Sequence, residues 1–339
     1  MIRSGGGGAS LTLTAPSVLL RWAQEMGANK AERRFRAILR INKGSGAYVA
    51  ALSDPNIGDR IRLGRGLDLI PIGQLADSPQ KQRLLQRQYN FEFGYSPPAT
   101  CALLFRRKID PLLYSESKEL FSSPPFPFEE ALTTRLCLSL VGPCAPIQLS
   151  AWFQFDDPEI NALSMAGSMS YPSPQEAVHF APVQTRAFDA RLARFILTRF
   201  RQLENHDRQK STRAAERLLQ SMCRRLPGDA AIDLSIALES LLGDTGAAGE
   251  HIWKISLRAA LLSEQKPDER RAARQLIKRI YDIRSHVMHD GLISKKHEKD
   301  AKERIIDGIA QTAKTIASAI KRGGIPKDWS QFELSGGKM

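Results

Sequence analysis

The chain contains few cysteines and no long apolar run, and each absence excludes a class of protein. Its 339 residues include only four cysteines, with no Cys-x-x-Cys pair: Cys101, Cys137, Cys144 and Cys223. Their number and scatter exclude a disulfide scaffold and a cysteine-based zinc finger, and favour small hydrophobic core residues. No run of about 18 apolar residues occurs, which argues against a membrane-spanning helix.

The first ten residues lack the apolar core that a secretory signal requires. They read MIRSGGGGAS, and we interpret them as a flexible, glycine-rich leader. We therefore expect a cytoplasmic protein with no membrane partner. Hydrophobic residues make up 42% of the chain and charged residues 25%, as is typical of globular proteins, and the length suffices for two domains.

Positive charge is in excess and is unevenly distributed along the chain. The formal net charge is +13, and residues 183–339 contain 30 Lys and Arg against 20 Asp and Glu, which accounts for +10. A basic domain attracts phosphate-rich partners, because phosphates that are neutralised release their counterions. Many basic helical domains have no such partner, so charge alone leaves nucleic-acid binding as one of two interpretations.

The first half of the chain is interrupted by proline and glycine, and strand-like runs lie between the interruptions. We interpret residues 1–180 as a mixed, β-containing domain that recognises a regulatory protein or ligand. A short Gly/Pro link predicts that its second and third strands pair antiparallel. The expected helices are Ser17–Met26 and Gln80–Gln88, and the expected strands are Cys101–Phe105, Leu132–Val141 and Ile147–Phe155.

The second half has little proline and shows helical periodicity. Residues 181–325 are predicted to form an all-α bundle, and residues 326–339 a C-terminal tail, so the fold class is a two-domain α+β chain. Asp229 is a candidate N-cap, and Gly243 and Gly291 are candidate helix ends. The expected helices are Arg186–Phe200, Ser211–Arg225, Ala230–Leu242, His251–Leu262, Pro267–His289 and His297–Lys321.

The stretch YDIRSHVMHDG, residues 281–291, gathers side chains that can carry chemistry. A helical wheel places Arg284 at the margin of an apolar stripe that includes Met288, and His289 on another side. The two lie about 140° apart at ~100° per residue, so one helix does not aim both at one point. Two copies of the helix packed together would form one cleft with two arginines and two histidines.

Such a cleft suits cleavage of an RNA phosphodiester without a metal. The ribose 2′-OH must lose a proton and the leaving 5′-oxygen must gain one, and histidine exchanges protons near neutral pH. Arginine offers a planar donor fork to the charged phosphate oxygens. RNA is then the substrate and DNA is not, because DNA lacks the attacking hydroxyl.

Two other interpretations of the stretch remain open. Asp282, His286 and His289 are spaced i, i+4, i+7 on one helix face, as zinc ligands can be, although no further ligand lies nearby in the sequence to complete the set. The same residues could also be ordinary helix-face pairs such as Asp282–His286, with the histidines complementing the helix dipole.

Three segments in order resemble the Apea-like group of HEPN domains, over about residues 190–325. DLSIALESLL (residues 233–242) resembles that group's "ALE-x-L" helix, and ISLRAALL (residues 255–262) its "LR-A-A" helix. YDIRSHVMHDG resembles its "YD-x-RS-x-x-x-HG" segment, with Asp290 inserted before the glycine.

The resemblance implies an α-helical homodimer that cleaves RNA without a cofactor, in a prokaryotic defence or toxin-type system. Arg284 would stabilise the phosphate charge and His289 would transfer the proton. The implied auxiliary residues are Ser285, which follows the arginine, Glu239, which would orient it, and His286 and Asp282. Glu239 could equally be an ordinary helix-face acid. Some members of the family have lost catalysis and act as RNA- or nucleotide-binding scaffolds, which is the alternative function here.

Overall fold

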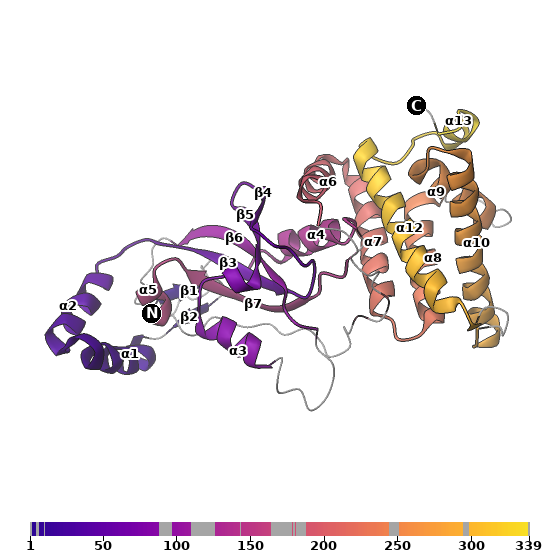
Figure 1. Cartoon of the computed structure of the whole chain (residues 1–339). Helices are drawn as coiled ribbons and strands as arrows, with labels where there is room; N and C mark the ends of the chain where they lie inside the picture. Colours follow the sequence, from indigo (N-terminus) through magenta and orange to yellow (C-terminus); the bar gives the residue numbers. More distant parts are fainter. Residues whose placement is uncertain are drawn as a thin grey trace. The chain divides into compact units, whose positions relative to one another are not determined.

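The structure is a computed structural model of the chain, and its two compact units differ in class. It describes residues 2–4, 7–9, 11–87, 97–109, 126–142, 144–163, 178, 180, 188–243, 251–293 and 298–337. Unit 1 consists of Met1–Ala131 and Ile147–Pro174, and unit 2 of Leu132–Pro146 and Gln175–Met339. Unit 1 contains an antiparallel sheet and unit 2 is helical (Figure 1), so the chain is α+β, as the sequence predicts.

The glycine-rich N-terminus contains two short strands, where the sequence predicts a flexible leader. Strand β1 (Ile2–Ser4) pairs antiparallel with β2 (Gly7–Ala9). Strand pairing uses only backbone groups, so a glycine-rich segment can form it without side-chain packing. The helices α1 (Leu11–Met26) and α2 (Ala28–Ile38) follow. The expected helix at Ser17–Met26 is therefore confirmed as the second part of α1.

The core of unit 1 is a five-stranded antiparallel sheet in the order β4-β5-β6-β3-β7. The central strand β3 is buried at every position except Ser45. A strand buried on both faces shows no apolar–polar alternation, which is why periodicity did not reveal β3. The elements of the sheet and its flanks are β3 (Gly44–Leu52), β4 (Ile61–Gly64), β5 (Leu67–Pro71), η1 (Ile72–Gln74), α3 (Pro79–Arg87), β6 (Cys101–Ile109), β7 (Gln148–Phe155) and α5 (Pro158–Leu163).

The strand predicted at Leu132–Val141 is wrong, because this segment belongs to helix α4 (Phe128–Leu138) and the turn after it. Leu136, Cys137 and Leu138 are all buried, so apolar residues occupy successive positions and mimic part of a strand pattern. The predicted pairing with the next strand is wrong too. Strand β7 pairs with β3 instead, in the register Tyr48 opposite Phe153.

Unit 2 is a helical bundle that contains all six expected helices, with ends shifted by a few residues. Asp229 is not an N-cap: it lies in the first turn of α8, which begins at Pro227. Gly243 and Gly291 do end their helices. Within the described residues, no helix combines the length and the apolar character needed to cross a membrane. The helices are α6 (Ala190–Gln202), α7 (Asn205–Cys223), α8 (Pro227–Leu242), α9 (His251–Ser263), α10 (Pro267–Asp290), α12 (Ala301–Arg322) and α13 (Trp329–Leu334).

The segment predicted as a tail contains α13, which packs on α9. Arg258 of α9 is buried, and its Nε donates to Glu333 Oε1 at 2.7 Å. The same guanidinium lies 4.6 Å from the centroid of the Trp329 ring. The indole and the carboxylate together compensate for the burial of the arginine charge.

Two glycines let α10 pack closely against its neighbours. A Cβ at Gly228, in the first turn of α8, would lie 2.6 Å from Val287 Cγ2. A Cβ at Gly308 of α12 would lie 2.8 Å from Ile280 Cδ1. A larger residue at either position would force the Val287 or Ile280 side chain to shift, so the two glycines allow α10 to lie close to α8 and α12.

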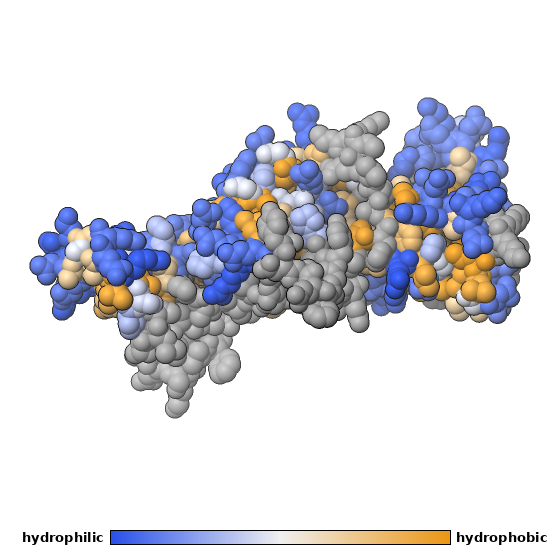
Figure 2. Space-filling model, turned by 60° about the horizontal axis from the view of Figure 1, so that its bottom comes forward, coloured by the Kyte–Doolittle hydropathy of each residue, from blue (hydrophilic) through white to orange (hydrophobic). Residues whose placement is uncertain are grey.

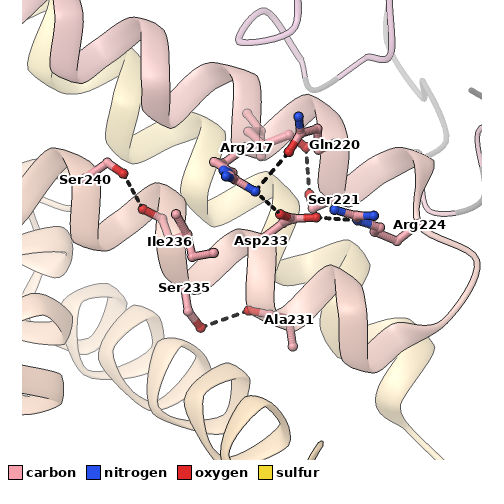
Figure 3. Close-up of polar contacts among 10 residues, drawn as sticks. Arg217, Gln220, Ser221, Arg224, Ala231, Asp233, Ser235, Ile236 and Ser240 are labelled. Carbon is pink, nitrogen blue, oxygen red and sulfur yellow. Dashed lines mark hydrogen bonds and ion pairs between the residues drawn. The ribbon is translucent and has the colours of Figure 1, made fainter. Parts of the chain in front are cut away.

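A buried carboxylate joins α7 to α8 (Figure 3). Asp233 of α8 accepts from Arg217 Nη1 at 3.0 Å and from Arg224 Nε at 2.5 Å, both from the C-terminal half of α7 and its end. The Asp233 side chain is 2% exposed, whereas those of Arg217 and Arg224 are 38% and 45% exposed. The acid therefore lies inside the bundle while its partners reach the surface.

Candidate active site

The candidate residues lie in the last three turns of α10, where the helix ends at the left-handed Gly291. Gly291 has φ 71°, and its N–H donates to Val287 O at 3.0 Å. Glycine adopts this conformation without strain, so it stops the helix directly after Asp290.

Arg284 is held by a neighbouring helix. Its Nη1 donates to Glu239 Oε1 of α8 at 2.7 Å, and both side chains are half-buried. The guanidinium carbon also lies 5.6 Å from the centroid of the Tyr281 ring. The structure thus brings together Arg284 and Glu239, as the resemblance implies, and adds an aromatic face beneath the arginine.

Tyr281 is a site residue to which the sequence reasoning assigned no role. It is buried, and its hydroxyl donates to Ser235 O at 3.5 Å. Burial, followed by the negative charge of Glu239 and a hydrogen bond with it, raises the pKa of Tyr281 well above the usual 10. The phenol therefore stays neutral and keeps a donor beside Glu239. Its position three residues before Arg284 was the available signal, since residues at i and i+3 share a helix face.

The remaining candidates do not converge on Arg284 within one chain. Asp282, Ser285 and His289 are exposed, and His289 lies five residues after Arg284 on the same straight helix. The Nδ1 of His286 lies 3.2 Å from Asp290 Oδ2, one helical turn further on. That contact still fits a helix-face pair.

The described residues contain no cluster of three His, Cys, Asp or Glu side chains that could hold a metal ion. The i, i+4, i+7 set of Asp282, His286 and His289 thus stays a pattern on a single helix face. A zinc site needs further ligands from another element or another chain.

Exposed apolar side chains surround the end of α10. Leu226 is 59% exposed, Met288 62% and Leu292 74%. Gly228 lies against Val287, which brings the start of α8 beside the end of α10. Hydrophobic residues gather at one end of unit 2 in Figure 2 (orange). The helical wheel places Met288 on the apolar stripe of α10, but its side chain is exposed in the last turn.

Comparisons with family models, with curated proteins and with solved structures found no match to this chain. The candidate function therefore depends on the residues of the site alone.

Proposed function

We propose that unit 2 is a metal-independent endoribonuclease that acts as a homodimer through Arg284 and His289. The observation that carries the proposal is the fixed arginine: Glu239 and Tyr281 hold Arg284 in one position, a turn and a half before an exposed histidine. A preorganised arginine is what stabilisation of a phosphoryl transition state requires.

The chemistry follows from the two side chains. Neutral His289 of one copy removes the proton of the ribose 2′-OH, and the 2′-oxygen attacks the adjacent phosphorus. The bond from phosphorus to the 5′-oxygen breaks, and a protonated histidine, the second copy's His289, supplies the proton to the leaving oxygen. The products are a 2′,3′-cyclic phosphate and a 5′-hydroxyl. Arg284 donates to the phosphate oxygens, which carry the additional negative charge.

A second copy completes the cleft because one helix directs Arg284 and His289 about 140° apart. The exposed Leu226, Met288 and Leu292 supply the apolar surface that such a copy would cover. Contiguous exposed apolar side chains of this kind mark interaction sites. The motif then lies beside the interface, where both copies contribute to it.

The test of catalysis is incubation of purified protein with total RNA in EDTA. Wild-type protein is expected to cleave, and Arg284→Ala and His289→Ala to lose about 100-fold or more of the rate, as when a general acid–base group is removed. Arg279→Ala on α10 and His206→Ala on α7 are matched controls, because both residues are exposed and lie outside the motif. Equal cleavage by all five proteins, or cleavage that stops in EDTA, would overturn the proposal.

The test of the shared cleft is the oligomeric state. Light scattering is expected to show a dimer for wild-type protein and a monomer for Met288→Glu/Leu292→Glu, with cleavage lost alongside. Leu334→Glu is the control, since Leu334 is 90% exposed on α13. A monomeric wild-type protein that cleaves RNA would contradict a composite site.

One observation favours the alternative of a non-catalytic RNA-binding unit. The carboxylate of Glu239 already neutralises Arg284 at 2.7 Å, so less positive charge remains for a phosphate. In that case wild-type protein binds RNA and leaves it intact.

A further inference from the structure

We infer that Trp253 and Arg274 form a subsite that stacks a base of single-stranded nucleic acid, on the same helix as the proposed cleavage site. The role of this subsite in RNA cleavage rests on the proposed function, but the residues that form it are different from Arg284 and His289. All four tryptophans lie in the described part of the chain, and three are buried: Trp22, Trp152 and Trp329. Trp253, in the first turn of α9, is 46% exposed.

An arginine holds the exposed indole in place. Helices α9 and α10 lie side by side (Figure 1), and the guanidinium carbon of Arg274 lies 5.2 Å from the centroid of the Trp253 ring. Nearly half of Trp253 stays exposed even though Arg274 covers part of it. A fixed aromatic ring with open surface beside an arginine is the arrangement that stacks unpaired bases.

Two cations near the indole reach the surface. Arg274 is partly exposed, although its Nε is buried and has no hydrogen-bond partner among the described residues. Lys278 follows one turn later on α10 and is exposed. A stacked base and two cations provide both contacts that single-strand binding requires: stacking and neutralisation of phosphates.

The subsite lies on the His289 side of α10. Ten residues separate Arg274 from Arg284, which is about 15 Å along the helix. Measured around the axis of α10 at ~100° per residue, Lys278 and His289 lie within about 20° of each other. Arg274 lies about 60° from His289, on the side towards Arg284. A strand stacked on Trp253 therefore runs along α10 past Lys278, and a nucleotide a few positions away reaches His289.

Stacking predicts preference for a single strand and tolerance of the base, because every base has a π-face. It also predicts that single-stranded DNA binds although it cannot be cut. A DNA strand therefore measures the subsite without any contribution from cleavage.

The experiment is titration with fluorescein-labelled oligo(dT) and oligo(U) of about twelve nucleotides, within the usual range of single-strand sites. Anisotropy gives the Kd, and tryptophan fluorescence reports stacking because the other three indoles are buried. Both oligonucleotides are expected to quench the fluorescence of wild-type protein. Trp253→Ala should weaken binding by about fivefold or more, the lower end of the effect of one base–aromatic stack.

The matched control is Phe195→Ala. Phe195 of α6 is 47% exposed, and Arg199 lies over its ring at 5.8 Å, so the same side-chain arrangement occurs away from α10. The Kd of Phe195→Ala for both oligonucleotides should equal that of the wild type. Arg274→Gln is a second variant that should also weaken binding. It tests the subsite even if Trp253→Ala does not fold.

The outcomes separate this inference from the proposed function. Binding with quenching but no RNA cleavage supports the subsite and refutes the nuclease. Cleavage with an unchanged Kd in Trp253→Ala and Arg274→Gln refutes the subsite and leaves the nuclease standing. Conversion of a wild-type dimer to a monomer by Trp253→Ala would also overturn the inference, because Trp253 would then be an interface residue.

Discussion

Asp233 and Glu239 lie six residues apart on α8 and both bind arginine, but in opposite surroundings. Asp233 is almost fully buried and accepts from two arginines that themselves reach the surface. Glu239 is half-buried and binds one arginine, which also lies against a tyrosine ring. In the first cluster the arginines compensate for a buried acid. In the second the acid and the ring position an arginine.

The burial of each carboxylate shows which residues of its cluster stabilise the others. Burial of an unpaired carboxylate costs several kcal/mol of folding free energy, and the ion pairs with Arg217 and Arg224 offset this cost for Asp233. The Arg284 and Glu239 side chains are 31% and 24% exposed, so water screens this pair more than it screens the Asp233 cluster, and its contribution to stability is smaller. The contact holds Arg284 in one position beside the Tyr281 ring, which the proposed function requires.

The largest expected effect is a loss of stability when the arginines around Asp233 are removed. Arg217→Ala/Arg224→Ala leaves the buried carboxylate without either arginine and should lower the free energy of unfolding by about 3–5 kcal/mol. Asp233→Asn should cost less, about 1–3 kcal/mol, because it releases two arginines that can turn to water. Urea unfolding followed by circular dichroism measures both. A double variant as stable as the wild type would show that the acid is not desolvated.

The next largest effect is expected from Glu239→Gln, which should reduce activity much more than stability. Glu239→Gln should lower the free energy of unfolding by only about 0.5–1.5 kcal/mol, because glutamine keeps the size of the side chain and an oxygen that can accept from Arg284. Under the proposed function, RNA cleavage should fall by about tenfold to a hundredfold, because a misplacement of ~1 Å has this effect on a catalytic group. Glu303→Gln on α12 is the control, as Glu303 is exposed. Loss of stability without loss of cleavage would make Glu239 a structural residue like Asp233.

The smallest effect concerns Tyr281 and depends on pH. Tyr281→Phe removes one buried hydroxyl and should cost about 0.5–1.5 kcal/mol near neutral pH. The folded pKa of Tyr281 is raised, so above about pH 10 the unfolded chain loses the proton and the folded chain keeps it. This contribution of the wild-type protein is complete below pH 10 and falls as pH rises, while the variant has no such dependence.

From about pH 8 to pH 11, the difference in urea midpoint between wild type and Tyr281→Phe should therefore stay constant up to about pH 9.5 and then narrow and reverse. Tyr48→Phe in unit 1 should show the same trend, because burial raises the pKa of Tyr48 to about 12. A constant difference across that range would mean that Tyr281 ionises as easily in the fold as outside it.

Local signals predicted the helical unit well. Pro267 and Gly291 marked both ends of α10, because a missing N–H and a left-handed conformation act within one turn of the chain. Local signals failed at β3, which is buried at every position except Ser45, and at α4, whose last three residues are all buried. A segment with no solvent-facing side shows no contrast between polar and apolar positions, so its period does not reveal whether it is strand or helix.

The candidate site divides in the same way. The divergence of Arg284 and His289 follows from their spacing on a helix and needs no tertiary structure. The contact of Arg284 with Glu239 crosses from α10 to α8, and it was expected from a family resemblance and not from any local pattern. The burial of Tyr281 and the exposure of Trp253 depend on what packs beside them, and no local pattern predicts either.

Short windows of sequence were enough to predict where the helices of unit 2 lie, where α10 stops and which residues share its faces, since helical geometry and glycine conformation act over a few residues. Tertiary structure decided which acid of α8 is buried, which arginine is held and which tryptophan stays exposed. Burial is set by contacts between segments far apart in the chain, and no short window of sequence contains both sides of such a contact.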